Sequence, residues 1–85
     1  MIPDSAIYDE LAVIFADVFM RDVALSATLS ARDVAGWDSF KQIEIVMATE
    51  ERFAMKFTSA ELDDLRNLGD LARIVAQRGR LPGAA

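Results

Sequence analysis

The apolar positions between residues 5 and 20 repeat with the period of an α-helix. Six apolar side chains fall on one stripe at steps of three and four residues: Ile7, Leu11, Ile14, Phe15, Val18 and Phe19. This spacing predicts a helix with one buried face over about residues 5 to 20. Asp4 or Ser5 is suited to cap its N-terminus.

Residues 21–37 show no sustained periodicity. Their apolar side chains are scattered among polar residues and glycine: Val23, Leu25, Leu29 and Val34. A long structureless connection is uncommon in a compact domain, so we expect an ordered loop that is pinned by these side chains and contains a short helical turn.

A second helix is predicted from Ser39 to Phe53, with Asp38 as the N-cap residue. We expect four of its apolar side chains to face inward: Ile43, Ile45, Val46 and Phe53. A short break follows at residues 54–57, where the side chains of Met55 and Phe57 are expected to pack into the core.

Two further helix starts follow the break. Thr58 and Glu61 have the spacing of a capping box, which predicts a short helix to about Leu65 with Leu62 and Leu65 facing inward. Asn67 can open a last helix in the same way. Its expected buried stripe is Leu68, Leu71, Ile74 and Val75, and Gly79 and Pro82 are expected to end it.

No segment alternates with the period of a β-strand, so the pattern predicts an all-α fold. We expect a four-helix bundle of three main helices and one short helix, forming a single domain over residues 1–85. The folded part is expected to cover about residues 5–78, and the tail 79–85 is expected to be frayed.

Charge narrows the classes of partner. The chain of 85 residues carries 14 acidic and 9 basic side chains, a net charge of −5. A surface of that sign repels nucleic-acid phosphates, so nucleic acid is not an expected partner. It attracts proteins with basic docking faces.

The chain contains no cysteine and no histidine. It therefore lacks a thiolate nucleophile, the commonest general base and the commonest transition-metal ligands, so we expect neither an enzyme nor a metal site. The apolar stretches are too short for a membrane span, and the N-terminus lacks a signal pattern. We expect a cytoplasmic protein that does not contact a membrane.

Ser39 stands at the start of the second helix, where a serine is most often a simple cap. Asp38 already supplies a cap, which leaves the Ser39 hydroxyl free for chemistry. A phosphate on that oxygen would lie at the positive end of the helix dipole and gain about 0.3–1 kcal/mol. Asp38 would oppose it unless a divalent cation bridges the two groups, which indicates modification by a separate metal-using enzyme.

The stretch Gly36-Trp37-Asp38-Ser39-Phe40 resembles the Asp-Ser-Leu attachment motif of acyl carrier proteins and peptidyl carrier domains. The resemblance continues through the run Ile43–Phe53, which is similar to the family's second helix. It also includes Met55–Thr58, similar to the family's exit loop, and Leu68-Gly69-Asp70-Leu71, similar to the opening of its last helix. It covers about residues 5–78.

The resemblance implies that Ser39 carries a 4'-phosphopantetheine arm, which a phosphopantetheinyl transferase moves from coenzyme A. Asp38 would then contact the transferase or its metal. The terminal thiol of the arm would hold an acyl or aminoacyl group as a thioester, so the reactive sulfur belongs to the cofactor. The implied partners are the transferase and the enzymes that load and transfer the acyl or aminoacyl group, acting on a monomeric carrier.

Several positions depart from the family pattern. Phe40 replaces the usual leucine after the serine, Ala54 stands where glycine is common, and Thr58 stands where proline is common. Thr49 places a hydroxyl where an apolar residue is usual, which could narrow or polarise an acyl cavity. Trp37 is more typical of carriers in polyketide, nonribosomal-peptide or surface-polymer pathways, which favours a specialised biosynthetic pathway.

Four residues of the second helix share one stripe beneath the serine: Phe40, Glu44, Met47 and Glu51. Their mixture of apolar and acidic side chains predicts a docking surface for partner enzymes. The alternative is that Phe40 and Met47 belong to the core and the glutamates are a solvated edge. From Asp38 to Asp64 the chain has seven acids and three bases, which places most of the net charge in this section.

Two functional hypotheses remain open from the sequence. In the first, the protein is a carrier modified at Ser39. In the second, it is an unmodified helical adaptor that binds partners through the acidic face of the second helix.

Trp37 is expected to pack the long loop onto the bundle, and Gly36 and Gly69 are expected to allow a turn or a close approach.

Overall fold

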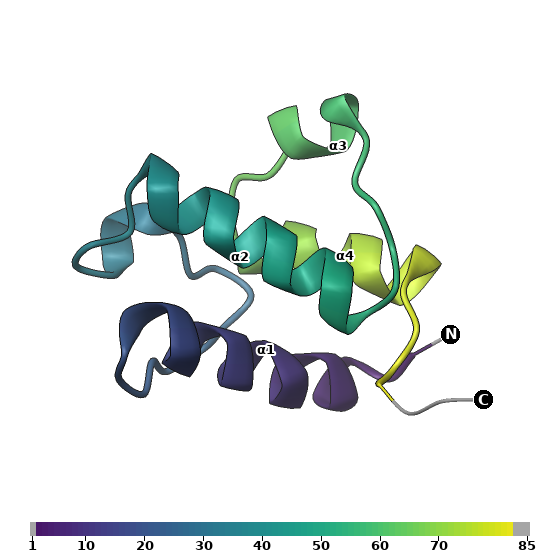
Figure 1. The fold of residues 1–85 in the computed structure, drawn as a ribbon, viewed down its shortest axis with the longest axis horizontal. Helices are drawn as coiled ribbons and strands as arrows, with labels where there is room; N and C mark the ends of the chain where they lie inside the picture. The colour runs from purple at the N-terminus through teal and green to yellow at the C-terminus, as the bar shows by residue number, and fades with distance from the viewer. Residues whose placement is uncertain (1, 83–85) are drawn as a thin grey trace.

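The computed structural model describes residues 2–82, and these residues contain four α-helices, one 3-10 turn and no β-strand (Figure 1). The elements run in the order α1 (Asp4–Phe19), η1 (Ala31–Asp33), α2 (Ser39–Arg52), α3 (Ser59–Asp63) and α4 (Leu68–Arg78). The predicted all-α fold of three main helices and one short helix is confirmed. No helix within residues 2–82 is long and apolar enough to cross a bilayer.

Helix α1 buries the six side chains of its predicted stripe. Each large apolar side chain that is fully buried contributes about 1.5–3 kcal/mol. Its start differs from the expectation, because the N-cap residue is Pro3 and no side chain caps the helix. The Pro3 carbonyl accepts hydrogen bonds from the amides of Ala6 and Ile7, so the helix begins at Asp4 without the Asp4 or Ser5 cap.

Helix α2 packs against α1 along a narrower face than the sequence predicted. Ile45 and Thr49 are buried, as is Phe53 immediately after the helix. The expectation that Ile43 faces inward is wrong, since its side chain is 55% exposed. Ile43 lies two residues from Ile45, which is about 200° around a helix, so the two side chains cannot share one face.

The loop between α1 and α2 is ordered, as predicted. Val34 is buried, and Val23, Leu25 and Leu29 pack against the core. The loop also bonds to the start of α4: the Leu68 amide donates to the Leu29 carbonyl at 2.8 Å, and the Gly69 amide donates to the Ala27 carbonyl at 2.8 Å. The long connection is therefore tied to the bundle at its middle.

Gly69 is required by this contact. A Cβ atom at Gly69 would lie 2.8 Å from the Ala27 carbonyl oxygen, a backbone atom that cannot turn aside. We therefore expect Gly69→Val to lower the free energy of unfolding by about 1–3 kcal/mol, measured by urea denaturation. The control is Gln77→Val, which puts the same β-branched side chain at an exposed position of α4. Equal losses in the two variants would contradict the close-approach explanation.

The two later helix starts are confirmed. Thr58 and Glu61 form the capping box of α3, and the Asn67 side chain accepts from the Asp70 amide at the start of α4. Helix α3 is shorter than expected, because it ends at Asp63 instead of near Leu65. Leu65 is half-buried, but Leu62 is more exposed than the predicted inward position implies.

The chain after α4 differs from the expected frayed tail. Gly79 caps α4, the Arg80 amide donates to the Phe53 carbonyl at 2.7 Å, and Leu81 packs against the core. This apolar side chain and backbone hydrogen bond hold residues 79–81 on the end of the bundle. Residues 83–85 of the predicted tail lie outside the described residues.

Candidate functional site

Ser39 is the first residue of α2 and its side chain is exposed. Within residues 2–82, no hydrogen bond of the structure uses the Ser39 hydroxyl. The position is open to solvent, and the amides of the first turn of α2 point toward it. A negatively charged group on this oxygen would be stabilised there by the helix dipole.

Asp38 fills the capping role that the sequence assigned to it. Its Oδ1 atom accepts a hydrogen bond from the Lys41 amide at 2.9 Å. Capping uses one carboxylate oxygen, and the Asp38 side chain is exposed. The serine that follows is therefore not needed to start the helix.

Trp37 fixes the chain that leads to the serine. Its ring lies edge-on to Phe15, with 5.3 Å between the ring centroids, and 6.1 Å from Phe19. Its indole N–H donates to the Gln42 side chain at 2.8 Å. Gly36 just before it has a φ of +87°, which favours glycine. As expected, Trp37 packs the loop onto the bundle, and it gives Ser39 a rigid base.

A cavity of about 610 Å³ lies beside Ser39, between the start of α2, the loop after α1 and the α3–α4 segment. Its apolar lining includes Ile45, Leu65, Leu68 and Leu71. Thr49 is not among the lining residues, and its hydroxyl donates to the Ile45 carbonyl at 2.7 Å within α2. Thr49 therefore does not line this cavity, and the backbone of α2 satisfies its hydroxyl.

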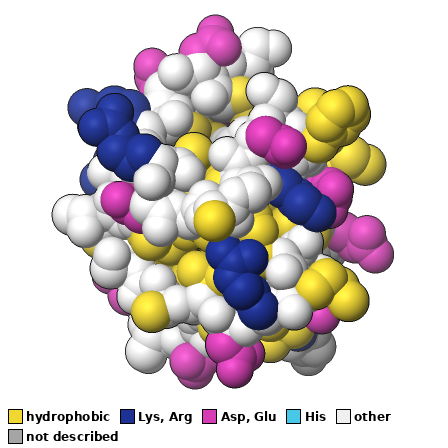
Figure 2. Space-filling model, turned by 90° about the vertical axis from the view of Figure 1, so that its left-hand side faces the viewer, with side chains coloured by type: hydrophobic (Ala, Val, Ile, Leu, Met, Phe, Trp, Pro, Cys, Tyr) yellow, Lys and Arg dark blue, Asp and Glu magenta, His cyan; other side chains and the backbone are white. Residues whose placement is uncertain are grey.

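The stripe predicted beneath the serine lies at the surface. Phe40 is 77% exposed and Met47 is 62% exposed, and Glu44 and Glu51 are also exposed. The alternative that Phe40 and Met47 belong to the core is thus wrong. Hydrophobic side chains lie at the surface beside acidic ones at the end of the molecule where α2 begins (Figure 2). Ile43, which was predicted to face inward, adds to this exposed apolar surface.

Lys41 lies next to Phe40 in the chain but outside the stripe, and its ammonium group contacts both α1 and the stripe. Lys41 donates from Nζ to the Val18 carbonyl at 3.1 Å, in the last turn of α1, and lies 3.8 Å from Glu44. A cation at a helix C-terminus is favourable, so this contact joins the end of α1 to the start of α2.

The buried carboxylate of Asp70 was not predicted from the sequence. This side chain accepts from the Arg66 amide at 3.0 Å and from the Arg66 guanidinium at 3.2 Å, and Arg73 lies 3.4 Å away. The Arg66 amide and then its guanidinium hold the pKa of Asp70 below its usual value. The signal available in the sequence was the spacing, because Arg66 lies four residues before Asp70 and Arg73 lies three residues after it.

We expect Asp70→Asn to lower the free energy of unfolding at pH 7 by roughly 1–2 kcal/mol, because hydrogen bonds to a charged acceptor are replaced by bonds to an amide. A carboxyl whose folded pKa is depressed stabilises the fold above its unfolded pKa, and this stability is lost as the pH falls through the folded pKa. The gap between wild type and Asp70→Asn should therefore close below about pH 4. Urea denaturation at several pH values measures it. Asp63→Asn, at an exposed position of α3, is the control. A difference in the free energy of unfolding that persists at low pH would show that the charge of Asp70 is not its cause.

The described residues hold no group of three or more acidic, cysteine or histidine side chains that could bind a metal ion. The fold and this site define a small helical protein with an exposed serine at the start of α2 whose hydroxyl the helix does not use. The family model described as a phosphopantetheine attachment site matches residues 9–75.

Among proteins of known structure, the chain is similar to the holo acyl carrier protein of Geobacter metallireducens, with 37% sequence identity and a TM-score of 0.76. The match covers 81% of this chain and 80% of that chain. No curated protein matches the chain. The chain belongs to the family of phosphopantetheine-binding carrier proteins, as its sequence motifs predicted. Its cofactor is a covalently attached 4'-phosphopantetheine. The exposed, uncommitted hydroxyl at the open end of α2 fits such a group.

Proposed function

We propose that Ser39 carries the 4'-phosphopantetheine arm and that the protein is a non-catalytic acyl carrier protein. The observation that carries this assignment is the exposed hydroxyl of Ser39 in the first turn of α2, whose cap is supplied by Asp38. The name of the similar Geobacter protein, a holo acyl carrier protein, supports the same function. When bound, the arm supplies a thiol that holds an acyl or aminoacyl group as a thioester.

The protein's own residues would orient and present this arm. Trp37 and its aromatic neighbours hold the serine at a fixed place, so that a partner enzyme meets the arm in one orientation. The positive end of α2 would stabilise the phosphodiester charge. The apolar cavity beside Ser39 gives an acyl group a place away from water.

The proposed partners are a phosphopantetheinyl transferase and the enzymes that load and transfer the acyl group. Asp38 uses one carboxylate oxygen for its cap, and its other oxygen is available to the metal ion of the transferase. Phe40, Glu44, Met47 and Glu51 form the docking surface, and their exposure supports this role. Trp37 before the Asp-Ser pair supports a specialised pathway of polyketide, nonribosomal-peptide or surface-polymer type.

The test is intact-mass measurement of the purified chain after incubation with coenzyme A, Mg²⁺ and a phosphopantetheinyl transferase of broad specificity. We expect a gain equal to one phosphopantetheinyl group, located on Ser39 by peptide mapping. A gain at any other residue would refute the site. No gain with any transferase tried would favour the unmodified adaptor that binds partners through α2.

A further inference from the structure

The short helix α3 forms one wall of the cavity beside Ser39, and it is weakly anchored in the core. Leu62 of α3 and Leu65 just after it line the cavity. No residue of α3 is buried, whereas α1 has six buried residues and α4 has five. Because α3 buries so little apolar surface, its place depends more on polar contacts than that of the other helices does.

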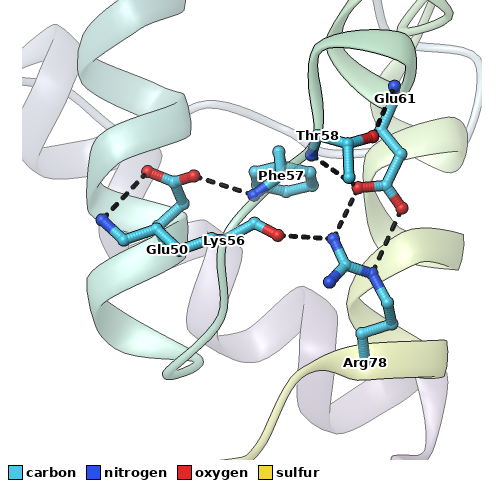
Figure 3. Close-up of polar contacts among 6 residues, drawn as sticks. All are labelled: Glu50, Lys56, Phe57, Thr58, Glu61 and Arg78. Carbon is cyan, nitrogen blue, oxygen red and sulfur yellow. Dashed lines mark hydrogen bonds and ion pairs between the residues drawn. The ribbon is translucent and has the colours of Figure 1, made fainter.

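One side chain from the last turn of α4 supplies contacts of this kind. Arg78 donates from Nη2 to the Lys56 carbonyl and to Glu61 Oε1, and from Nε to Glu61 Oε2 at 3.2 Å (Figure 3). The fork of a guanidinium suits two carboxylate oxygens. Arg78 therefore joins both α3 and the segment before it to α4. Among the described residues, every hydrogen bond between α4 and α3 comes from Arg78.

The Glu61 carboxylate has two roles at this point. Its Oε1 atom also accepts from the Thr58 amide at 2.8 Å, which completes the capping box. This amide, followed by the Arg78 side chain, holds the pKa of Glu61 below its usual value, so Glu61 is charged at neutral pH. The contact of Arg78 is thus made with a side chain that the helix start already holds in place.

The neighbouring contacts hold the segments on either side of α3 but not α3 itself. Glu50 of α2 accepts from the Phe57 amide at 2.8 Å and lies 3.8 Å from the Lys56 ammonium (Figure 3). After α3, the Arg66 amide is bonded to Asp70. The two ends of the α3 region are therefore fixed, and Arg78 is the tie between them.

We propose that Arg78 is a latch that holds α3 over the cavity and so positions the wall that shields an apolar group tethered at Ser39. The part concerning a tethered group rests on the proposed function, whereas the part concerning α3 does not. Without the Arg78 contacts, α3 is held only by Leu65 and the capping box, so α3 moves away from the cavity more often. Arg78 is a positioning residue, since it does not line the cavity.

The first test is hydrogen exchange on the full, unmodified chain. We expect Arg78→Ala to speed exchange of the amides of Leu62 in α3 and of Asp64, its C-cap residue, roughly fivefold, because three charge-assisted hydrogen bonds are lost. Amides of α1 should exchange at the wild-type rate. Arg80→Ala removes the same charge two residues later but leaves the three hydrogen bonds of Arg78 in place, and it should not change exchange in α3. Equal exchange in wild type and Arg78→Ala would overturn the latch.

A second variant keeps the test decisive if Arg78→Ala loses its fold. Glu61→Gln retains an acceptor for the Thr58 amide but removes the charge that Arg78 contacts. We expect faster exchange in α3 for this variant too. The double variant should exchange no faster than Arg78→Ala alone, because both changes remove one shared contact. Additive effects would show that the two residues act separately and would overturn the proposal.

The third test uses the chain loaded with an octanoyl group on the arm. We expect hydroxylamine to cleave the octanoyl thioester roughly fivefold faster in Arg78→Ala than in wild type and Arg80→Ala, in proportion to the opening of α3. Equal cleavage despite faster α3 exchange would overturn the shielding role. A chain that cannot be loaded at all would refute the proposed function, whereas the exchange measurements on the unmodified chain would still decide whether Arg78 holds α3.

Discussion

Ser39→Ala is expected to abolish phosphopantetheinylation while leaving the fold intact. The variant lacks the oxygen that would form the phosphodiester, and no hydroxyl of a neighbouring residue replaces it at the first turn of α2. The intact mass should stay at that of the unmodified chain after treatment with coenzyme A and the transferase that modifies wild type. Any mass gain equal to one arm in Ser39→Ala would show that another residue is used.

The fold should survive because Asp38, not Ser39, caps α2. A substitution at an exposed position away from a cap usually changes the free energy of unfolding by no more than about 0.5 kcal/mol. Thermal unfolding followed by circular dichroism should therefore give a Tm within about 4 °C of wild type. A much larger fall would indicate that Ser39 has a structural role that the cap geometry does not reveal.

Ser59 offers a matched control for this experiment. Like Ser39 it is exposed and is the first residue of a helix, and the residue before it supplies the cap. Ser59→Ala should be loaded at the wild-type rate. Loss of loading in both variants would point to a general effect on the fold, since the two serines lie on different helices.

Met47→Glu and Glu44→Lys are expected to lower kcat/KM for loading by the transferase by about tenfold or more each. Met47 is 62% exposed and would meet an apolar patch of the partner, where a carboxylate is desolvated without a counter-charge. Glu44→Lys places a cation on a surface whose acidic charge would attract a basic partner face. The rate of mass gain at limiting carrier concentration measures both effects.

The control for the charge change is Asp9→Lys, at an exposed position of α1. It alters the net charge by the same amount as Glu44→Lys but leaves the α2 surface unchanged. Higher salt should reduce the difference between Glu44→Lys and wild type, since screening weakens exposed charges over about 10 Å. Equal slowing by Asp9→Lys would show that net charge, and not a docking surface on α2, governs the rate.

Local patterns predicted the elements well. The stripe of α1, the Asp38 cap, the Thr58–Glu61 capping box and the Asn67 start all depend on residues within one or two helical turns of each other. The same is true of the placement of Ser39 in the first turn of α2. Such features are set by spacing alone, so they can be deduced without knowing what the helix packs against.

The predictions of which residues are buried were wrong where burial depends on the element that a residue packs against. Ile43 has apolar chemistry and helical spacing, but the face of α2 that meets α1 is centred on Ile45 and Thr49. The end of the chain has little local pattern, and Leu81 and the Arg80 amide are held by contacts with a bundle that is formed elsewhere in the sequence.

The sequence by itself determined the helical class, the family and the serine at the start of α2, because each depends on short-range spacing and on motifs of a few residues. Only the tertiary structure revealed the cavity beside Ser39 and the Arg78 contact that ties α3 to α4. These features join residues distant in the chain, such as Arg78 and Glu61, whose approach depends on how the helices pack.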